Sequence, residues 1–428
     1  MKTFTLIGKT YLLLLLVGIA LIYCVHCIPF SAIKQNVDIS CKIIGHEKYY
    51  NVLYYDFGFK PNIHQGNMNY LLDGFTDAVM LMETCNTKEG NHLRASMVND
   101  RIRTKQGELP FDVIDGYTAR LNDKNVELYS YGRYWHGYLV TLIPALTMMD
   151  LSQIRIFNCI LFLLLIITIC YLTYRELCLS TMIAFLIPLA FGLFFPIVPY
   201  SLQYSSVFYI AFISSIIILS CNKYWLTKPR TIVFFFIIGA ITSYFDFLTA
   251  PIVTLGFPLL FYGLRKETPT IKELFLLCAI WAMGYGLMWM SKWIVAYLLA
   301  GVNVFEQAYS HAAIWTGTNG ENPSLVQLLR HLVVNAPIFN NILLGLILMT
   351  LFVIPKSPSG IRKNSWFLFV ALVPIVWLIL MRQHTYIHYW FSWRNLFVSF
   401  FALLLFVNRI ADYRRIKQFI STLFKKAT

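Results

Sequence analysis

Long apolar runs are the feature that most restricts the fold of this chain. Runs of about 17–25 residues, the length of helix that crosses the hydrocarbon core of a bilayer, recur from Tyr11 to the C-terminus. The composition agrees, because 58% of the 428 residues are hydrophobic, only 13% are charged and the mean hydropathy is +0.61. These values exclude a soluble globular domain. The sequence therefore predicts an all-α polytopic membrane protein.

About ten transmembrane helices are predicted. An eleventh is left open because the apolar stretch Gly137–Leu151 is only about 15 residues long and is assigned to the interface. The predicted spans are Tyr11–Cys27, Ile156–Leu172, Met182–Pro199, Ser205–Cys221, Thr231–Phe247, Leu248–Leu264, Leu274–Trp293, Pro337–Ile354, Trp366–Met381 and Leu396–Arg409.

Three regions follow from these spans. Residues 1–29 form an N-terminal transmembrane helix. Residues 30–151 form a large first extracytoplasmic loop with amphipathic, interfacial helices. Residues 152–428 form a multi-helix membrane domain with outer loops near 301–336 and 382–395.

The distribution of basic residues predicts the orientation. Of the 35 Lys and Arg residues, 18 lie in the termini and the linkers assigned to the cytoplasm, and five lie in the short outer segments. Short cytoplasmic segments are enriched in Lys and Arg, whereas long translocated loops are exempt. We therefore expect a multi-pass protein of the plasma or inner membrane with both termini in the cytoplasm. The net charge of +14 sets this topology, and no nucleic-acid partner is expected.

Three acidic residues are candidate catalytic groups. Asp73 and Asp77 lie four apart in the predicted outer loop, a spacing that puts both on one face of a helix. Repulsion between them would raise one pKa and suit that carboxyl to general base catalysis, although an acid at a helix start is the structural alternative. Asp246 lies between two spans, where an ionisable group suggests function and a helix cap is the alternative.

Basic groups beside aromatic residues are candidate substrate-binding groups. Arg133 and His136 lie in the stretch Tyr131–His136, and Lys292 lies between Trp289 and Trp293. An Arg side chain binds phosphate with two parallel hydrogen bonds. The alternative is an aromatic belt with basic side chains that snorkel to the interface.

The last outer segment has the densest polar chemistry. His384 and His388 lie four apart and Arg394 follows them, with aromatic residues between. The pair would permit zinc, but no third ligand lies nearby, so no metal site and no cofactor are predicted and a divalent ion is left open. Contact with phosphate or hydroxyl groups is expected, and an aromatic belt with solvated histidines is the alternative.

The topology resembles the GT-C class of membrane glycosyltransferases. The resemblance rests on a large acidic first outer loop followed by many helices with polar groups at the outer face, and not on a specific motif. Such enzymes have an essential acidic residue in that loop, a position that Asp73 and Asp77 match in kind and place. The adjacent Asp-Glu or Asp-Asp pair of several such families is absent. No nucleotide-binding lysine loop or GxSxG motif is present either, which disfavours cytosolic nucleotide-sugar chemistry.

The resemblance implies transfer of a sugar from a polyprenyl phosphate or pyrophosphate carrier to a glycan, lipid or protein acceptor. A carboxylate would deprotonate the acceptor hydroxyl, and nearby cations would stabilise the departing phosphate. Two alternatives stay open: an O-antigen-type polysaccharide polymerase or ligase, and a lipid or sugar transporter or flippase. The transporter would need charges near the bilayer midplane and two related halves.

Overall fold

The structure of the chain is a computed structural model. It describes residues 2–45, 72–88, 90–103, 110–122, 126–222, 227–246, 248–318, 322–335, 337–352, 355, 357–412 and 415. Part of the predicted extracytoplasmic loop (46–71) and nearly all of the predicted cytoplasmic C-terminal tail lie outside the described residues.

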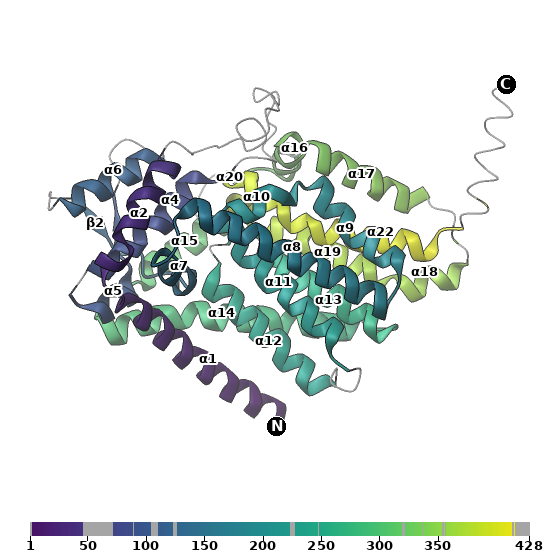
Figure 1. Cartoon of the computed structure of the whole chain (residues 1–428). Helices are drawn as coiled ribbons and strands as arrows, with labels where there is room; N and C mark the ends of the chain where they lie inside the picture. The colour runs from purple at the N-terminus through teal and green to yellow at the C-terminus, as the bar shows by residue number, and fades with distance from the viewer. Residues whose placement is uncertain are drawn as a thin grey trace, which may run out of the picture.

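The chain begins with one long helix, α1 (Lys2–His26). A group of short elements follows, here called the cap segment, which gathers at one end of the molecule (Figure 1). Its members are α2 (Phe30–Ile44), α4 (Gly74–Glu83), η3 (Thr84–Lys88), α5 (His92–Val98), β1 (Arg101–Ile102), α6 (Pro110–Leu121), β2 (Leu128–Tyr129) and α7 (Leu139–Leu146). The two strands pair antiparallel, with Arg101 opposite Tyr129.

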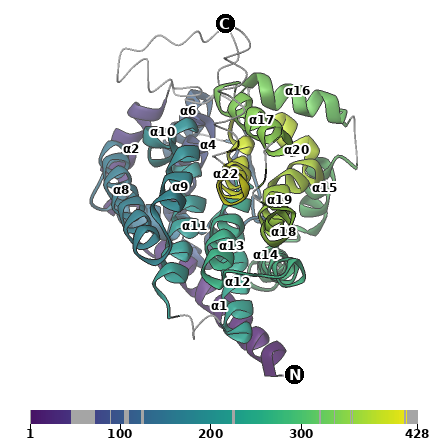
Figure 2. The same cartoon turned by 90° about the vertical axis from the view of Figure 1, so that its right-hand side faces the viewer.

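The rest of the chain forms a bundle of helices (Figure 2). The bundle contains α8 (Leu151–Glu176), α9 (Leu179–Phe191), α10 (Phe194–Tyr200), α11 (Leu202–Ser220), α12 (Lys228–Phe245), α13 (Ile252–Lys266), α14 (Ile271–Ala300), α15 (Phe305–Thr316), α16 (Leu325–Asn335), α17 (Pro337–Phe352), α18 (Pro358–Asn364), α19 (Trp366–Leu380), α20 (Arg382–Ile387), α21 (Tyr389–Ser392), η5 (Trp393–Leu396) and α22 (Phe397–Ile410).

Several of these helices are long and apolar enough to cross a bilayer. Among the described residues, five helices meet this test by length and composition, and two further pairs meet it if each is one bent span. The five are Thr3–His26, Leu151–Glu176, Leu202–Ser220, Ile271–Ala300 and Tyr389–Ile410. The bent pairs are α9 with α10, at 69°, and α18 with α19, at 47°. The chain is therefore an all-α, multi-pass membrane protein.

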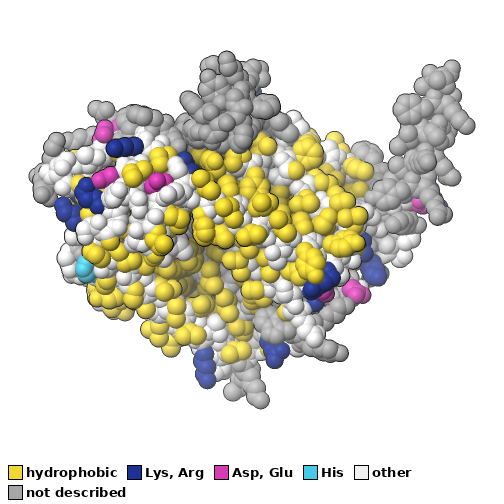
Figure 3. Space-filling view, viewed as in Figure 1, with side chains coloured by type: hydrophobic (Ala, Val, Ile, Leu, Met, Phe, Trp, Pro, Cys, Tyr) yellow, Lys and Arg dark blue, Asp and Glu magenta, His cyan; other side chains and the backbone are white. Residues whose placement is uncertain are grey.

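The surface of the bundle fits this assignment. Along α8, side chains three and four residues apart are about half exposed, namely Ile160, Leu163, Leu164 and Ile167. The opposite face of α8 is buried in the core through Phe162 and Ile169. A helix with apolar residues on both faces suits contact with protein on one side and lipid on the other. Figure 3 shows hydrophobic side chains over this region and charged ones at its margins.

Close backbone contact holds α12 against α14. Gly239 of α12 lies against the backbone of Trp281, and Gly284 of α14 lies against the backbone of Phe236. A Cβ at either glycine would overlap that backbone. Small residues at such crossings let membrane helices approach closely. This pair of helices carries the cap segment, because Trp135 donates from Nε1 to the carbonyl of Met288 over 2.6 Å.

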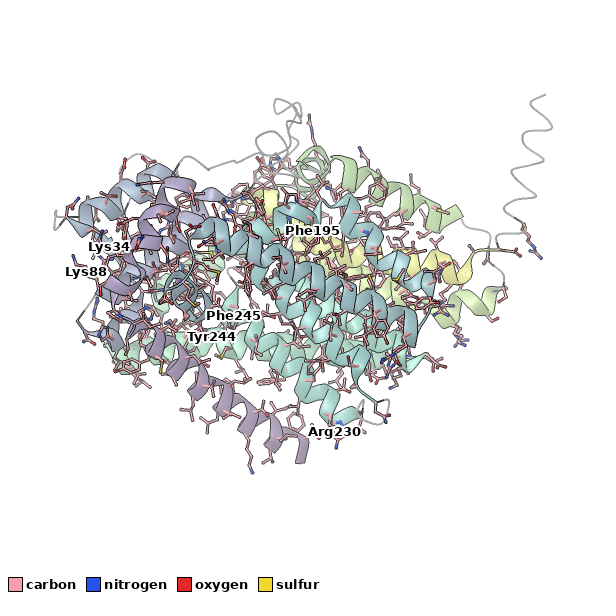
Figure 4. All side chains as sticks on the ribbon, viewed as in Figure 1. Lys34, Lys88, Phe195, Arg230, Tyr244 and Phe245 are labelled. Atoms are coloured by element: carbon pink, nitrogen blue, oxygen red, sulfur yellow. The ribbon has the colours of Figure 1, made fainter. Side chains whose placement is uncertain are left out.

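The cap segment shares one core with the membrane helices. Val37 of α2, Met80 of α4 and Ile143 of α7 are buried with Ile22 of α1 and Met288 of α14. Lys34 and Lys88 lie at this end of the molecule, whereas Arg230 lies at the opposite end of α12 from Tyr244 and Phe245 (Figure 4). Polar chemistry can therefore meet the bundle where the cap segment joins it.

Candidate functional site

A cavity of about 530 Å³ lies where the cap segment meets the bundle. The cap segment contributes Asp73, α4, both strands and the turn that follows them, and the bundle contributes α11, α15, α20 and α21. The lining includes four of the predicted site residues, Asp73, Arg133, His384 and His388. Residues more than 300 positions apart in sequence therefore form one site.

Asp73 supplies the carboxylate of this cavity. It precedes α4 and caps it, because Oδ1 accepts from the Thr76 backbone N–H at 3.1 Å and Oδ2 from the Thr76 hydroxyl at 2.8 Å. Trp390 Nε1 also donates to Oδ2 over 3.1 Å. Asp73 is 4% exposed. The helix start thus fixes the carboxylate and presents it to the cavity, since a capping Asp is held by the first turn of its helix.

Arg133 supplies a buried guanidinium to the cavity. Its carbon Cζ lies 4.4 Å from the centre of the Tyr131 ring and 5.1 Å from that of Tyr134. Its carbonyl accepts from the indoles of Trp289, at 2.9 Å, and Trp293, at 3.3 Å. Atoms Nε and Nη1 are buried and have no hydrogen-bond partner among the described residues. Such donors are costly to bury and fit an anionic ligand that accepts from both.

Histidine side chains from the bundle also line the cavity. Burial lowers the pKa of His388 to about 4, and burial together with Arg133 lowers that of His311 to about 4. Burial also lowers the pKa of His384 well below its usual value. These imidazoles are therefore neutral near pH 7, so each can donate one hydrogen bond and accept another. That property suits hydroxyl groups better than it suits charge neutralisation.

Aromatic rings complete the lining. They come from both sides of the cavity, and the ones closest to the charged groups are Tyr129, Tyr131, Tyr134, Trp315 and Trp390. The ring of Trp315 contacts His384 and His388 edge-on at 5.2 and 5.3 Å between ring centres. Aromatic faces present an apolar surface with a polar edge. The combination of rings, neutral imidazoles and a guanidinium can bind a polyhydroxylated phosphate ester.

Asp77 lies outside the cavity lining, in a structural position. Its carboxylate accepts from the backbone N–H groups of Leu202 and Gln203, at 3.2 and 3.0 Å, and from the Ser201 hydroxyl at 3.2 Å. It therefore satisfies the start of α11. Burial is the main cause that raises its pKa to about 7, and repulsion by Asp73 is a smaller one.

His136 and Lys292 lie outside the cavity lining, in a buried polar cluster. His136 Nδ1 lies 2.8 Å from Glu83 Oε2, and its Nε2 lies 2.9 Å from the carbonyl of Tyr131. Lys292 donates to the carbonyl of Ser96 over 3.3 Å and is fully buried. Glu83 also accepts from Tyr138. This cluster fixes the turn that carries Arg133.

Asp246 and Arg394 also lie outside the cavity lining. Asp246 accepts from the Thr249 backbone N–H at 3.0 Å, at the turn between α12 and α13. Arg394 is fully buried, donates to the Trp390 carbonyl over 2.8 Å and stacks on Tyr204, with Cζ 4.3 Å from the ring centre. Asp246 therefore holds the turn between α12 and α13, and Arg394 holds the backbone of Trp390, which lines the cavity.

An apolar groove of about 580 Å³ adjoins the cavity. It lies between α7, α8, α11 and α12 and is lined mostly by aliphatic side chains. The two spaces share walls, because Val79 and Gln203 line the cavity while their chain neighbours, Met80 and Leu202, line the groove. The polar and the apolar space are therefore separated by the start of α11 and one turn of α4.

Other lining residues were not predicted from the sequence. On α15, Gln307, His311 and Trp315 line the cavity and are spaced by four. That spacing puts them on one helix face and is a signal that the sequence contains. Arg101 lies in a strand of two residues, too short for any pattern to mark. Among the described residues no cluster of three or more His, Cys, Asp or Glu that could hold a metal ion was found.

No known family model matches this chain, and neither a curated protein nor a solved structure matches it.

Proposed function

We propose that this chain is a membrane glycosyltransferase of the GT-C type. It takes a sugar from a polyprenyl phosphate or pyrophosphate donor and transfers it to a glycan, lipid or protein acceptor. The observation that supports this proposal is one cavity that contains a fixed carboxylate, a buried guanidinium with two unused donors, and aromatic walls. An apolar groove next to it suits the polyprenyl chain of the donor.

In the proposed reaction, Asp73 accepts the proton of the acceptor hydroxyl. The hydroxyl oxygen forms a bond to the anomeric carbon, and the bond from that carbon to the phosphate oxygen breaks with inversion. The bonding electrons leave with the phosphate, whose charge Arg133 stabilises through Nε and Nη1. His384 and His388, neutral near pH 7, contact sugar hydroxyls. Arg133 and the aromatic rings thereby keep the donor headgroup beside the carboxylate.

The topology we propose has ten spans, with the cap segment outside and both termini in the cytoplasm of a cell whose plasma or inner membrane contains the protein. The excess of Lys and Arg in the predicted inner linkers supports this orientation. A cysteine placed at Asn91, which precedes α5 in the cap segment, should react with an impermeant thiol reagent in intact cells. Reaction only after cell rupture would reverse the orientation.

The proposal is tested by comparing lipid-linked saccharides, by mass, in cells with and without the chain. Loss of the transferase should cause one polyprenyl-linked sugar to accumulate and one glycan to lose a residue. A change in polymer length without a missing residue would favour a polymerase. Unchanged lipid-linked sugars on both sides of the membrane would contradict transfer, and redistribution between the leaflets would favour a flippase.

A further inference from the structure

Helix α16 lies across the bundle at its edge. Figure 1 shows α16 nearly end-on, whereas α8 and α14 run across the same view. After the 90° turn, Figure 2 shows α16 lengthwise at the periphery. It contacts α17, α20 and α21. Since α8 and α14 are among the predicted spans, α16 lies roughly parallel to the plane of the bilayer.

The side chains of α16 form three sectors around its axis. Leu328 and Leu332 are buried against the bundle. Leu325, Val326 and Leu329 are apolar and 43%, 73% and 56% exposed. Each residue of an α-helix turns by about 100°, so the exposed apolar sector directly adjoins the buried one.

The third sector of α16 is polar. Gln327 and Arg330 are exposed, and the same rotation of about 100° per residue puts them on the side of the helix opposite the buried sector. Arg330 lies at the border between the apolar and the polar sector. A helix with one side to protein, one apolar side and one polar side fits the interface between lipid and water.

The apolar sector continues onto the neighbouring helix. One residue separates α16 from α17, on which Leu344 and Leu348 are each 47% exposed and Leu351 is 72% exposed. This surface belongs to the apolar part of the bundle, so the occupant that covers it is the bilayer. At the border, Arg330 can extend its apolar stem along the lipid and its guanidinium to the phosphate headgroups.

We infer that α16 is an interfacial helix that inserts Leu325, Val326 and Leu329 into the leaflet nearest the cap segment, beside the cavity. His331 of α16 packs on Tyr386 and Tyr389, with ring centres 4.6 and 4.2 Å apart. The residues next to these two tyrosines, Ile387 and His388, line the cavity. The inferred headgroup layer therefore lies beside this part of the cavity lining. This inference is independent of the reaction that the cavity performs.

Site-specific nitroxide labels test the insertion. A nitroxide-bearing amino acid replaces either Val326 or Gln327 in the full-length chain, reconstituted in vesicles of phosphatidylcholine and phosphatidylglycerol. Collision with molecular oxygen reports lipid, and collision with a water-soluble nickel chelate reports water. Ile167, exposed on α8, serves as the lipid-facing reference. Positions 326 and 327 are neighbours in the sequence, but 326 lies in the exposed apolar sector of α16 and 327 lies in the polar sector.

The label at position 326 should be more accessible to oxygen than to the nickel chelate, as at position 167. The label at position 327 should be more accessible to the nickel chelate. Equal accessibility to the chelate at both positions would overturn the inference, since α16 would then be in water. Protection of 326 from both reagents would also overturn it, because a second copy or another protein would then cover this surface. A normal elution profile of each labelled protein confirms that the label has not unfolded it.

Discussion

Replacement of Arg133 by Lys tests the contribution of its two buried N–H donors to ligand binding. The substitution keeps one positive charge but removes the planar arrangement that lets two N–H groups reach two oxygens of one phosphate. In the protein, Nε and Nη1 are buried and have no partner among the described residues, so a ligand phosphate would be the acceptor for both. The stacking of the guanidinium on Tyr131 and Tyr134 is also lost.

The expected size of the effect follows from these two donors. A hydrogen bond to a charged group contributes about 1.5–3 kcal/mol. An ammonium group retains one of the two contacts, so Arg133→Lys should cost about one such bond. At 1.4 kcal/mol for each factor of ten, the Kd should rise by about 10- to 150-fold.

The assay uses farnesyl phosphate, a short polyprenyl phosphate, and follows the tryptophan fluorescence of the detergent-solubilised protein. Trp315 and Trp390 line the cavity and should report binding. The matched control is Arg103→Lys. Arg103 also lines the cavity, but its side chain is 61% exposed and pairs with Glu127 at 2.9 Å. Arg103→Lys should therefore change the Kd for farnesyl phosphate by less than about threefold. Equal affinities of the wild type and Arg133→Lys would refute the proposed phosphate contact.

Three further predictions concern the surroundings of the site. The pKa of Asp77 is raised to about 7 from about 4 in the unfolded chain, so its contribution to stability is largest below pH 4 and is lost as the pH rises through 7. The melting temperature of Asp77→Asn should therefore depend less on pH between about 4.5 and 7.5 than that of the wild type. Equal slopes of melting temperature against pH would contradict this. Gly284→Ala should lower the melting temperature, because its Cβ would overlap the backbone of α12, whereas Gly286→Ala, which has nothing within 4 Å, should not; equal losses would contradict the close packing. Glu83→Gln should lower the free energy of unfolding in denaturant by about 1–3 kcal/mol, because the buried carboxylate of Glu83 contacts His136 and accepts from Tyr138, and an unchanged free energy of unfolding would contradict this.

The sequence predicted the helices better than the site. Each predicted span overlaps a helix or a bent pair, because a long apolar run has few alternatives in lipid. Of the described helices, however, only five are long and apolar enough to cross a bilayer, or seven if each bent pair is one span. The first span, Tyr11–Cys27, corresponds to α1, which starts nine residues earlier, at Lys2, and ends at His26. The break between α9 and α10 was not predicted, since the run Met182–Pro199 is apolar throughout.

The site that each side chain faces depends on tertiary packing, which the spacing of residues in the sequence does not give. Asp73 and Asp77 were predicted on one face of a helix, but the helix begins after Asp73, which caps it, and Asp77 points to the start of α11 instead. Arg133 and Lys292 looked alike as cations beside aromatic residues. In the structure Arg133 lines the cavity, whereas Lys292 does not line it and donates to the carbonyl of Ser96. Tertiary packing made that difference.

The most direct test of the proposed transfer measures release of polyprenyl phosphate by the purified protein. The donor is the lipid-linked sugar that accumulates in cells lacking the chain. Asp73→Asn keeps the shape of the side chain but removes the proton acceptor, so the rate should fall by about 10²–10⁴-fold. Asp77→Asn, matched in chemistry but outside the cavity, should lose far less. A folded Asp73→Asn protein that releases polyprenyl phosphate at the wild-type rate would contradict the account.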